Sequence, residues 1–347
     1  MEQIYKFNKT PPARLKYDDA DFIYFFTMDY LFLFAGLALL LLGAEFLVDS
    51  SVAIAKRAKV SSFVIGLTIV GMGTSAPEMF VSLSSAWNGN GDVAVGNIIG
   101  SNICNIFLIL GASATILPFA IQGNIIRRDI PFGIFAAVLV TLLGHKSLLS
   151  DNFSNTITRI DGIVFLVLFF AYMGFTIYKS RKETSGTEDE AISRLTGKPV
   201  FLLIPIAIAS LAGLVFGGKL FLGAAENLAR AWGVSDAVIA ITVVALGTSL
   251  PELITSIVAA LKKNSELAFG NVIGSNIFNI FLILGVSSVA KPIAIQGVRV
   301  EDFAVMIFAT LCTFLVTCTF RPKYFDRIEG IFFLICYVGY TAYLVMR

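Results

Sequence analysis

The chain has 347 residues, of which 56% are hydrophobic and only 14% are charged, and its formal net charge is +2. Its mean hydropathy of +0.82 is far above that of a soluble domain, and the near-neutral charge gives no reason to expect nucleic acid as a partner. Apolar runs of about 20 residues recur along the chain and are long enough to cross a hydrocarbon core of ~30 Å. The composition therefore predicts an all-α polytopic protein embedded in a lipid bilayer.

The first 29 residues are expected to form a solvated or interfacial N-terminal tail. They mix Lys and Arg with Asp and lack the charged-then-apolar order of a cleavable signal. After this tail, the apolar runs predict ten transmembrane helices. These predicted spans lie near residues 30–52, 61–87, 93–117, 130–145, 160–179, 200–229, 235–261, 266–290, 302–320 and 328–346.

A polar segment, residues 180–199, divides the ten spans into two groups of five. Its composition is that of a flexible linker without a domain of its own. We therefore expect one five-helix repeat over residues 30–179 and a second over residues 200–347. Because five is odd, the second repeat is expected to lie upside down relative to the first. Lys and Arg are more frequent in the loops on the linker's side, which predicts a cytoplasmic linker and both termini outside.

The two halves repeat each other at a shift of 174 residues. GTSAPE at 73–78 aligns with GTSLPE at 247–252, and AVGNIIGSNICNIFLILG at 94–111 aligns with AFGNVIGSNIFNIFLILG at 268–285. Fifteen of the eighteen positions in the longer pair are identical. Chance does not produce such agreement, so the halves arose by duplication. Inverted repeats with discontinuous helices are typical of secondary transporters, whose site lies at the repeat interface near the bilayer midplane.

The second predicted span is interrupted by GTSAPE, which places Glu78 and Pro77 at membrane depth. Proline suits the first turn of a helix, and Thr or Ser suits the position before it. One half-helix is therefore expected to end near residues 71–73 and another to start near residues 75–77. The break frees backbone carbonyls that can face a cation, and Thr74 can share a face with Glu78. The seventh span is expected to break in the same way, at Thr248, Pro251 and Glu252.

The span after each break carries a polar stripe. Asn97, Ser101 and Asn105 are spaced i, i+4 and i+8 and so share one face of a helix. The second repeat matches them with Asn271, Ser275 and Asn279. Glycine pairs beside the stripe are expected to let a neighbouring helix approach closely. These pairs are Gly96 with Gly100 and Gly270 with Gly274.

Together the two motifs supply two carboxylates, several amide and hydroxyl oxygens, and freed carbonyls. Such a set suits a hard cation, since Ca²⁺ takes about six to eight oxygen ligands. One Ca²⁺ or two Na⁺ would balance the two glutamates, and a site that accepts either is the minimal chemistry of an antiporter. Alternatively, the glutamates are buried protonated carboxyls and the stripe residues are interhelical hydrogen-bonding groups. For Asn97, Asn102, Asn271 and Asn276 a packing or ligand-orienting role is the favoured interpretation.

The remaining polar residues suggest no chemistry of their own. Glu45, Asp49, Lys219 and Glu226 are interpreted as interfacial or helix-pairing groups near span ends. His145 is the only histidine, which excludes a His-rich zinc site. No nucleophile–base pair, redox motif or nucleotide-binding loop occurs, so neither an enzyme nor a bound cofactor is expected.

GTS-x-PE followed by GNxxGSNxxN, present twice, resembles the α-repeats of the cation/calcium exchanger superfamily, above all its bacterial and archaeal sodium/calcium exchangers. The resemblance extends from about Tyr30 to the C-terminus. It implies the family's ten helices in two inverted repeats, with Na⁺ and Ca²⁺ competing for adjacent sites during alternating access. It also implies a prokaryotic inner (plasma) membrane.

The resemblance also implies roles for individual residues. Glu78 and Glu252 would bridge the central Ca²⁺ site, with Thr74 and Thr248 contributing carbonyl and hydroxyl oxygens. The positions near the sodium sites are matched by Ser75, Ser101, Ser249 and Ser275, and those offering backbone carbonyls by Gly71 and Ala245. Several sodium/calcium exchangers carry aspartate where this chain has Asn279. The site then holds two formal charges, which leaves room for H⁺ coupling; an uncoupled channel or sensor is the third hypothesis.

Overall fold

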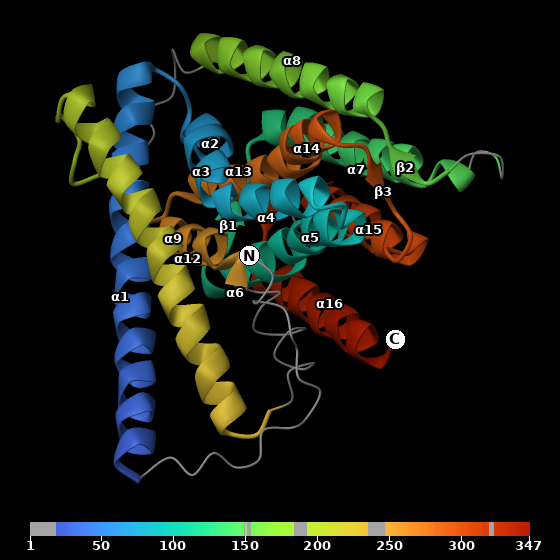
Figure 1. Ribbon diagram of the computed structural model, residues 1–347. Helices are drawn as coiled ribbons and strands as arrows, with labels where there is room; N and C mark the ends of the chain where they lie inside the picture. The colour runs from blue at the N-terminus through green and yellow to red at the C-terminus, as the bar shows by residue number, and fades with distance from the viewer. Residues whose placement is uncertain (1–18, 149, 151–153, 184–192, 235–246, 319–322) are drawn as a thin grey trace.

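In the computed structural model, the described residues are 19–148, 150, 154–183, 193–234, 247–318 and 323–347, and nearly all of them are helical (Figure 1). The first half contains α1 (Asp19–Ala58), α2 (Ser62–Ile65), η1 (Gly66–Val70), α3 (Gly71–Thr74), α4 (Ala76–Trp87), α5 (Gly91–Ile103), η2 (Cys104–Leu110), α6 (Gly111–Ile116), η3 (Ile125–Asp129), α7 (Ile130–Gly144), η4 (Lys146–Leu148) and α8 (Arg159–Glu183). The second half contains α9 (Val200–Ala231), α12 (Leu250–Leu261), α13 (Ser265–Ile277), η6 (Phe278–Ile283), α14 (Leu284–Ala290), α15 (Val300–Cys318) and α16 (Arg327–Met346).

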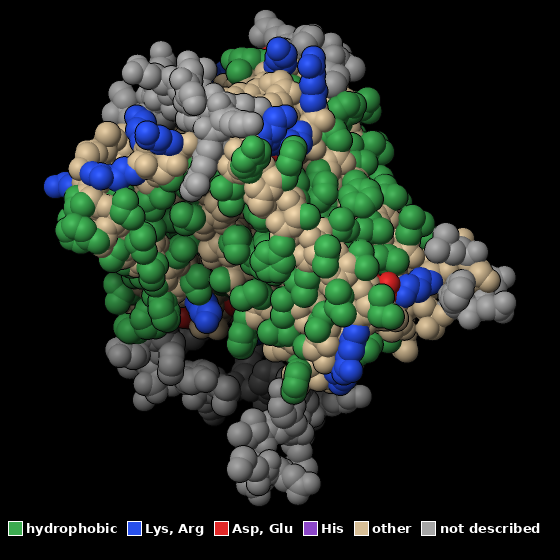
Figure 2. All heavy atoms as spheres, turned by 90° about the horizontal axis from the view of Figure 1, so that it is seen from above, with side chains coloured by type: hydrophobic (Ala, Val, Ile, Leu, Met, Phe, Trp, Pro, Cys, Tyr) green, Lys and Arg blue, Asp and Glu red, His purple; other side chains and the backbone are tan. Residues whose placement is uncertain are grey.

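Among the described residues, seven helical runs are long and apolar enough to cross a membrane, and the bent run from α2 to α4 would be an eighth. The run of α7 is shorter, with 15 residues. The first part of the predicted seventh span, residues 235–246, lies outside the description. Seen from above, hydrophobic side chains cover most of the surface, and Lys and Arg gather in a few small groups (Figure 2). The all-α membrane fold predicted from composition is confirmed.

The long helices α1 and α9 lie side by side and form a pair at one edge of the molecule (Figure 1). Glycines make this close contact possible. A Cβ atom added at Gly36 would lie 2.5 Å from the backbone nitrogen of Phe221, and one at Gly217 would lie 2.9 Å from the carbonyl oxygen of Gly36. The second-repeat glycine pair acts as predicted at α13, where a Cβ at Gly274 would lie 2.5 Å from the Cα of Leu67. Side chains at these positions would force the helices apart.

Two short antiparallel ladders join the repeats to each other. Strand β1 (Phe119–Ala120) pairs with β4 (Tyr324–Phe325), and β2 (Thr156–Ile157) pairs with β3 (Ile293–Ala294). Each ladder therefore takes one strand from each half of the chain. This exchange fixes the two halves relative to one another outside the helical core.

Two π-helical segments follow the polar stripes at equivalent positions. The segments η2 and η6 begin at Cys104 and Phe278, which the 174-residue shift superimposes. A π-helix bonds each N–H to the carbonyl five residues back, so its turn is wider than that of an α-helix and often marks a functional site. Asn105 and Asn279 each lie in the first turn of these wide segments.

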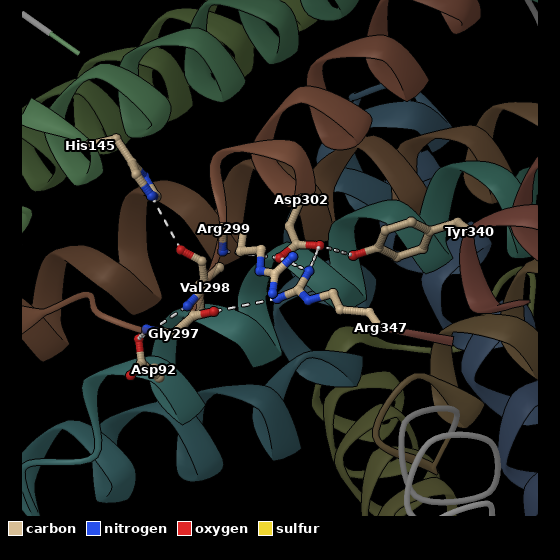
Figure 3. A network of polar contacts seen from close by, with 8 residues as sticks. All are labelled: Asp92, His145, Gly297, Val298, Arg299, Asp302, Tyr340 and Arg347. Atoms are coloured by element: carbon tan, nitrogen blue, oxygen red, sulfur yellow. Dashed lines mark hydrogen bonds and ion pairs between the residues drawn. The ribbon is translucent and has the colours of Figure 1, made fainter. Parts of the chain in front are cut away.

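The segment that leads into α15 is held by side chains from several helices (Figure 3). Asp92 at the start of α5 accepts hydrogen bonds from the backbone N–H groups of residues 296–298, at 2.8, 2.8 and 3.3 Å. The His145 ring lies 3.2 Å from the last carbonyl of this segment. At its far side, Arg347 contacts both carboxylate oxygens of Asp302 at 2.9 Å. This network therefore ties the start of α15 to α5 and to Arg347 at the end of α16.

Candidate ion-binding site

The break in the second span lies where the sequence predicts it. Helix α3 ends at Thr74, Ser75 has the non-helical angles φ −80° and ψ 9°, and α4 starts at Ala76 with Pro77 in its first turn. The two half-helices meet at an angle of 50°. In the second repeat, Ser249 has φ −90° and ψ 5°, and α12 begins with Pro251 in its first turn. Ser75 and Ser249 thus share non-helical angles, and each precedes a half-helix with proline in its first turn; residues 235–246, before the second break, lie outside the described residues.

Each break places a glutamate in the first turn of the following half-helix, deep inside the protein. Glu78 and Glu252 are both 1% exposed. The Ser75 hydroxyl donates a hydrogen bond to Oε1 of Glu252 at 2.9 Å, and the Ser249 hydroxyl donates to Oε1 of Glu78 at 3.4 Å. The serine of one break thus contacts the carboxylate of the other, so the two breaks face each other across the repeat interface.

The first asparagine of each stripe packs its helix against the preceding half-helix. Asn97 donates to the Ser82 hydroxyl at 2.9 Å, and Asn271 donates to the Ser256 hydroxyl at the same distance. Both amides also donate to the backbone carbonyl of their own repeat's glutamate, at 3.4 and 3.3 Å. These bonds fix the register between the glutamate helix and the stripe helix, in line with the orienting role expected for them.

The other four asparagines are hydrogen-bonded to one another across the repeat interface. Asn105 Nδ2 donates to Asn276 Oδ1 at 2.9 Å, and Asn279 Nδ2 donates to Asn102 Oδ1 at 3.0 Å. Asn102 and Asn276 in turn donate to each other's backbone carbonyls, at 3.4 and 3.3 Å. Because the amide nitrogens of Asn105 and Asn279 are engaged as donors, their Oδ1 atoms remain as acceptors.

Four buried oxygen atoms of this region have no hydrogen-bond partner within the described part of the chain. They are Glu78 Oε2, Glu252 Oε2, Asn105 Oδ1 and Asn279 Oδ1. The 174-residue shift relates them as two pairs. Buried polar atoms without partners are unfavourable unless something else satisfies them, and oxygen acceptors of this kind suit a hard cation. The described residues contain no cluster of three or more His, Cys, Asp or Glu side chains, so this carboxylate pair is not part of a larger acidic cluster.

The hydroxyl groups expected near the glutamates lie close to the same region, with one difference between the repeats. Thr74 is fully buried, and its hydroxyl lies 3.3 Å from Oδ1 of Asn271. Ser275 donates to the carbonyl of Gly71 at 3.3 Å, and Ser101 is 5% exposed. Thr248, in contrast, is only half-buried. Ala245 lies outside the described residues.

A cavity of about 400 Å³ explains the exposure of Thr248. It lies between α4, α9 and the second break, and both break prolines line it together with Lys219. Its described lining residues are Ala76, Pro77, Phe80, Val81, Val215, Gly218, Lys219, Leu222, Gly247, Thr248 and Pro251. The cavity therefore reaches the second break, since Gly247, Thr248 and Pro251 all line it.

The position of Lys219 corrects the interpretation made from the sequence. It was expected near a span end, but it lies within α9, roughly three turns before Ala231. The predicted span 200–229 nearly matches the helix Val200–Ala231, so the error concerned the place of Lys219 within the helix and not the helix's length. A sequence signal was nevertheless present, because the 174-residue shift aligns Lys219 with Glu45, a reversal of charge.

At the linker end, ion pairs hold α1 against the end of α12. Lys262 Nζ lies 2.8 Å from Oδ1 of Asp49 and donates to the Glu45 carbonyl at 3.2 Å. Arg194, in the described part of the linker, lies 2.9 Å from the Glu45 carboxylate. The helix-pairing role expected for Glu45 and Asp49 is thereby confirmed.

The comparisons with known proteins agree on one family. The family model described as "Sodium/calcium exchanger protein" matches residues 28–178 and 202–346. The chain is 36% identical to "Putative antiporter CaxA" of Alkalimonas amylolytica, over 90% of this chain and 98% of that protein. It is 30% identical to "Sodium/calcium exchanger MaX1" of Methanosarcina acetivorans, over 92% of this chain and 99% of that protein. A solved structure of the sodium-calcium exchanger NCX_Mj, soaked with Na⁺ and Ca²⁺, superposes with a TM-score of 0.76 at 32% identity, covering 91% of this chain and 98% of that chain.

Proposed function

Since the chain belongs to the sodium/calcium exchanger protein family, it is a membrane antiporter for cations and not an enzyme, and we propose that it exchanges Ca²⁺ for Na⁺ by alternating access. In this proposal the protein lies in a prokaryotic inner membrane, with the linker in the cytoplasm and both termini outside. The proposed ion ligands are Thr74, Ser75, Glu78, Ser101, Asn105, Thr248, Ser249, Glu252, Ser275 and Asn279.

The observation that carries this proposal is the set of four unpartnered oxygens on Glu78, Glu252, Asn105 and Asn279. A bound cation would satisfy all four at once. Among the described residues, no Lys, Arg or His forms an ion pair with either glutamate. Two buried carboxylates without a basic partner are unstable unless a counter-charge accompanies them, and the transported ion supplies that charge.

Charge balance determines which ions can replace one another at the proposed site. The two glutamates carry two formal negative charges, which one Ca²⁺ or two Na⁺ neutralise. Either load leaves the site neutral, and a neutral site can be moved through a low-dielectric interior with a smaller penalty than a charged one. Asn279 contributes an oxygen without a third charge, so a third Na⁺ would be uncompensated.

H⁺ coupling is the second candidate, and Asn279 is the observation that favours it. With only two carboxylates, two protons also neutralise the site, so a proton can replace Na⁺ as the counter-ion. In this version the glutamates carry the protons and Ca²⁺ displaces them. The ligand set for Ca²⁺ is the same in both candidates.

The test measures Ca²⁺ uptake into proteoliposomes loaded with Na⁺ and diluted into sodium-free buffer, with the pH gradient held at zero. Glu78→Gln and Glu252→Gln are each expected to lower uptake at least about 100-fold, the equivalent of the ~3 kcal/mol that an uncompensated buried charge costs. Glu301→Gln, at the exposed start of α15, is the matched control and should transport normally.

The outcomes separate the candidates. Uptake that requires internal Na⁺ supports sodium/calcium exchange. Uptake that appears only when a pH gradient is imposed supports H⁺ coupling. Undiminished Ca²⁺ transport in both glutamate variants would reject the ligand assignment altogether.

A further inference from the structure

We propose that the cavity is an ion entry route and that Lys219 weakens the loading of Ca²⁺ through it by electrostatic repulsion. The inference rests on the proposed function, since it concerns the same site. The cavity that Lys219 lines also contains Thr248 and both break prolines, Pro77 and Pro251. Each of these residues lies within four positions of a glutamate of the site. The ammonium group therefore lines the same cavity as the residues next to the two carboxylates.

Nothing in the described structure neutralises this ammonium. Lys219 is exposed and forms no ion pair with a described residue. The other described lining residues are Ala, Pro, Phe, Val, Gly, Leu and one Thr, so no carboxylate of the described residues lines the cavity with it. A charge surrounded by apolar walls acts over a longer distance than one in bulk water, because the low dielectric constant of the walls focuses its field. Lys219 thus raises the electrostatic potential along the route to the site.

The equivalent position in the first repeat carries the opposite charge. Glu45 aligns with Lys219 at the 174-residue shift, and Gly223 takes the place of Asp49 on α9. The carboxylate of Glu45 is engaged by Arg194 at 2.9 Å. The two ends of the site therefore present different fields to ions, although the ligands between them are repeated.

Repulsion by a fixed charge depends on the charge of the ion. A divalent ion is repelled twice as strongly as a monovalent one at the same place. If the potential of Lys219 weakens the binding of each Na⁺ by a factor f, it weakens the binding of Ca²⁺ by f². Lys219 therefore raises the half-saturating concentration on the cavity side by f² for Ca²⁺ and by f for Na⁺, although one Ca²⁺ and two Na⁺ carry the same total charge. A residue that only supported packing would not produce this squared relation.

The experiment compares Lys219→Met with the unmodified protein in whole cells and in inverted membrane vesicles, which expose opposite ends of the site. On the cavity side, the half-saturating concentration should fall about tenfold for Ca²⁺ and about threefold for Na⁺, as expected for a partly screened unit charge. Lys219→Arg should behave as the unmodified protein. Lys291→Met is the matched control, because Lys291 is an exposed lysine that contacts the carbonyl of Trp87 at the end of α4.

Ionic strength provides a second readout. Adding choline chloride screens the ammonium, so the difference between Lys219→Met and the unmodified protein should shrink. Equal changes for Ca²⁺ and Na⁺, an equal effect of Lys291→Met, or no effect of Lys219→Met would each overturn the inference. The failure of the Lys219 proposal can be told apart from the failure of the proposed function. If H⁺ replaces Na⁺ as the counter-ion, the Ca²⁺ measurements still test Lys219. Normal transport by the Glu78→Gln and Glu252→Gln variants, in contrast, rejects the site itself.

Discussion

At the linker end of the candidate site, Lys262 joins the end of α12 to α1 through Asp49 at 2.8 Å. At the opposite end, the equivalent positions are Asn88 and Gly223, which offer no charges for such a pair, and a cavity of about 400 Å³ lies between α4 and α9. The linker end therefore has an ion pair that the opposite end lacks, and a cavity lined by Thr248 lies between α4 and α9.

The difference shows that duplication preserved the residues of the candidate site and not those at its ends. Glutamates, serines and asparagines recur at the 174-residue shift. The residues that flank the candidate site differ in charge between the two repeats. The proposed ligands are therefore symmetric, whereas the residues at the two ends of the candidate site are not.

Removing the charge of Lys262 should have the largest effect on the contrast between the two ends. Asp49 is 3% exposed, so Lys262→Met leaves a buried carboxylate without its cation, a change that typically costs about 3 kcal/mol. We expect a clear loss of thermal stability in detergent and a weaker attachment of α1 to α12. A fluorescence-monitored melting curve measures it. Lys198→Met serves as the control, because Lys198 is an exposed lysine within the linker.

A double variant decides whether the Lys262 effect comes from charge pairing. Lys262→Met combined with Asp49→Asn removes both charges, so most of the lost stability should return. If the double variant is as unstable as the single one, packing of the lysine stem and not the ion pair holds the linker end together.

A second test introduces the charged residues of the linker end at the equivalent positions of the opposite end. Asn88→Lys together with Gly223→Asp places a potential ion pair at the positions equivalent to Lys262 and Asp49. This pair would stabilise a form in which α9 closes on α4, so Ca²⁺ uptake should slow several-fold, the equivalent of roughly 1 kcal/mol. Transport kinetics in proteoliposomes measure the effect. Each single variant should have little influence, and a normal rate in the double variant would contradict the closure.

The smallest expected effect concerns His145, which follows α7 near the segment held by Asp92. Burial lowers the pKa of His145 from its ordinary 6.5, although the Val298 carbonyl and the carboxylates of Asp302 and Glu301 oppose the shift. The unfolded chain therefore binds the proton more readily, so the stability contributed by neutral His145 is present above pH 6.5 and is lost as the pH falls.

Melting curves between pH 8 and pH 5 test the role of His145. In His145→Phe, whose ring can keep the edge contact with Phe303, the melting temperature should fall less steeply with acidification than in the unmodified protein. Parallel curves for the two proteins would show that His145 does not take up a proton in this range.

The part of the site that depends on local sequence could be predicted. GTS-x-PE specifies a helix break because Pro77 and Pro251 suit a first helical turn and the serine before each adopts non-helical angles. The i, i+4, i+8 spacing likewise placed Asn105 and Asn279 on the face that turns inward. These features need only the geometry of a single helix, which the sequence encodes directly.

What depends on contacts between the repeats could not be predicted. The bonds from Asn105 to Asn276 and from Asn279 to Asn102 require the relative placement of two segments that lie 171 and 177 residues apart. Similarly, the apolar residues around Lys219 match those of a lipid-facing helix, and only the neighbouring α4 and second break turn its surroundings into a cavity. Local patterns contain no information on such a neighbour.

The π-helical segments η2 and η6 indicate what the half-chain contained before it was duplicated. A π-helical segment corresponds to one extra residue in an α-helix, and removing that residue would rotate everything beyond it by about 100°. Both halves contain the segment at the same aligned position, so the insertion was already present in the single ancestral half before it was copied. A single half contains one such asparagine, so two of them come together only where two inverted halves meet.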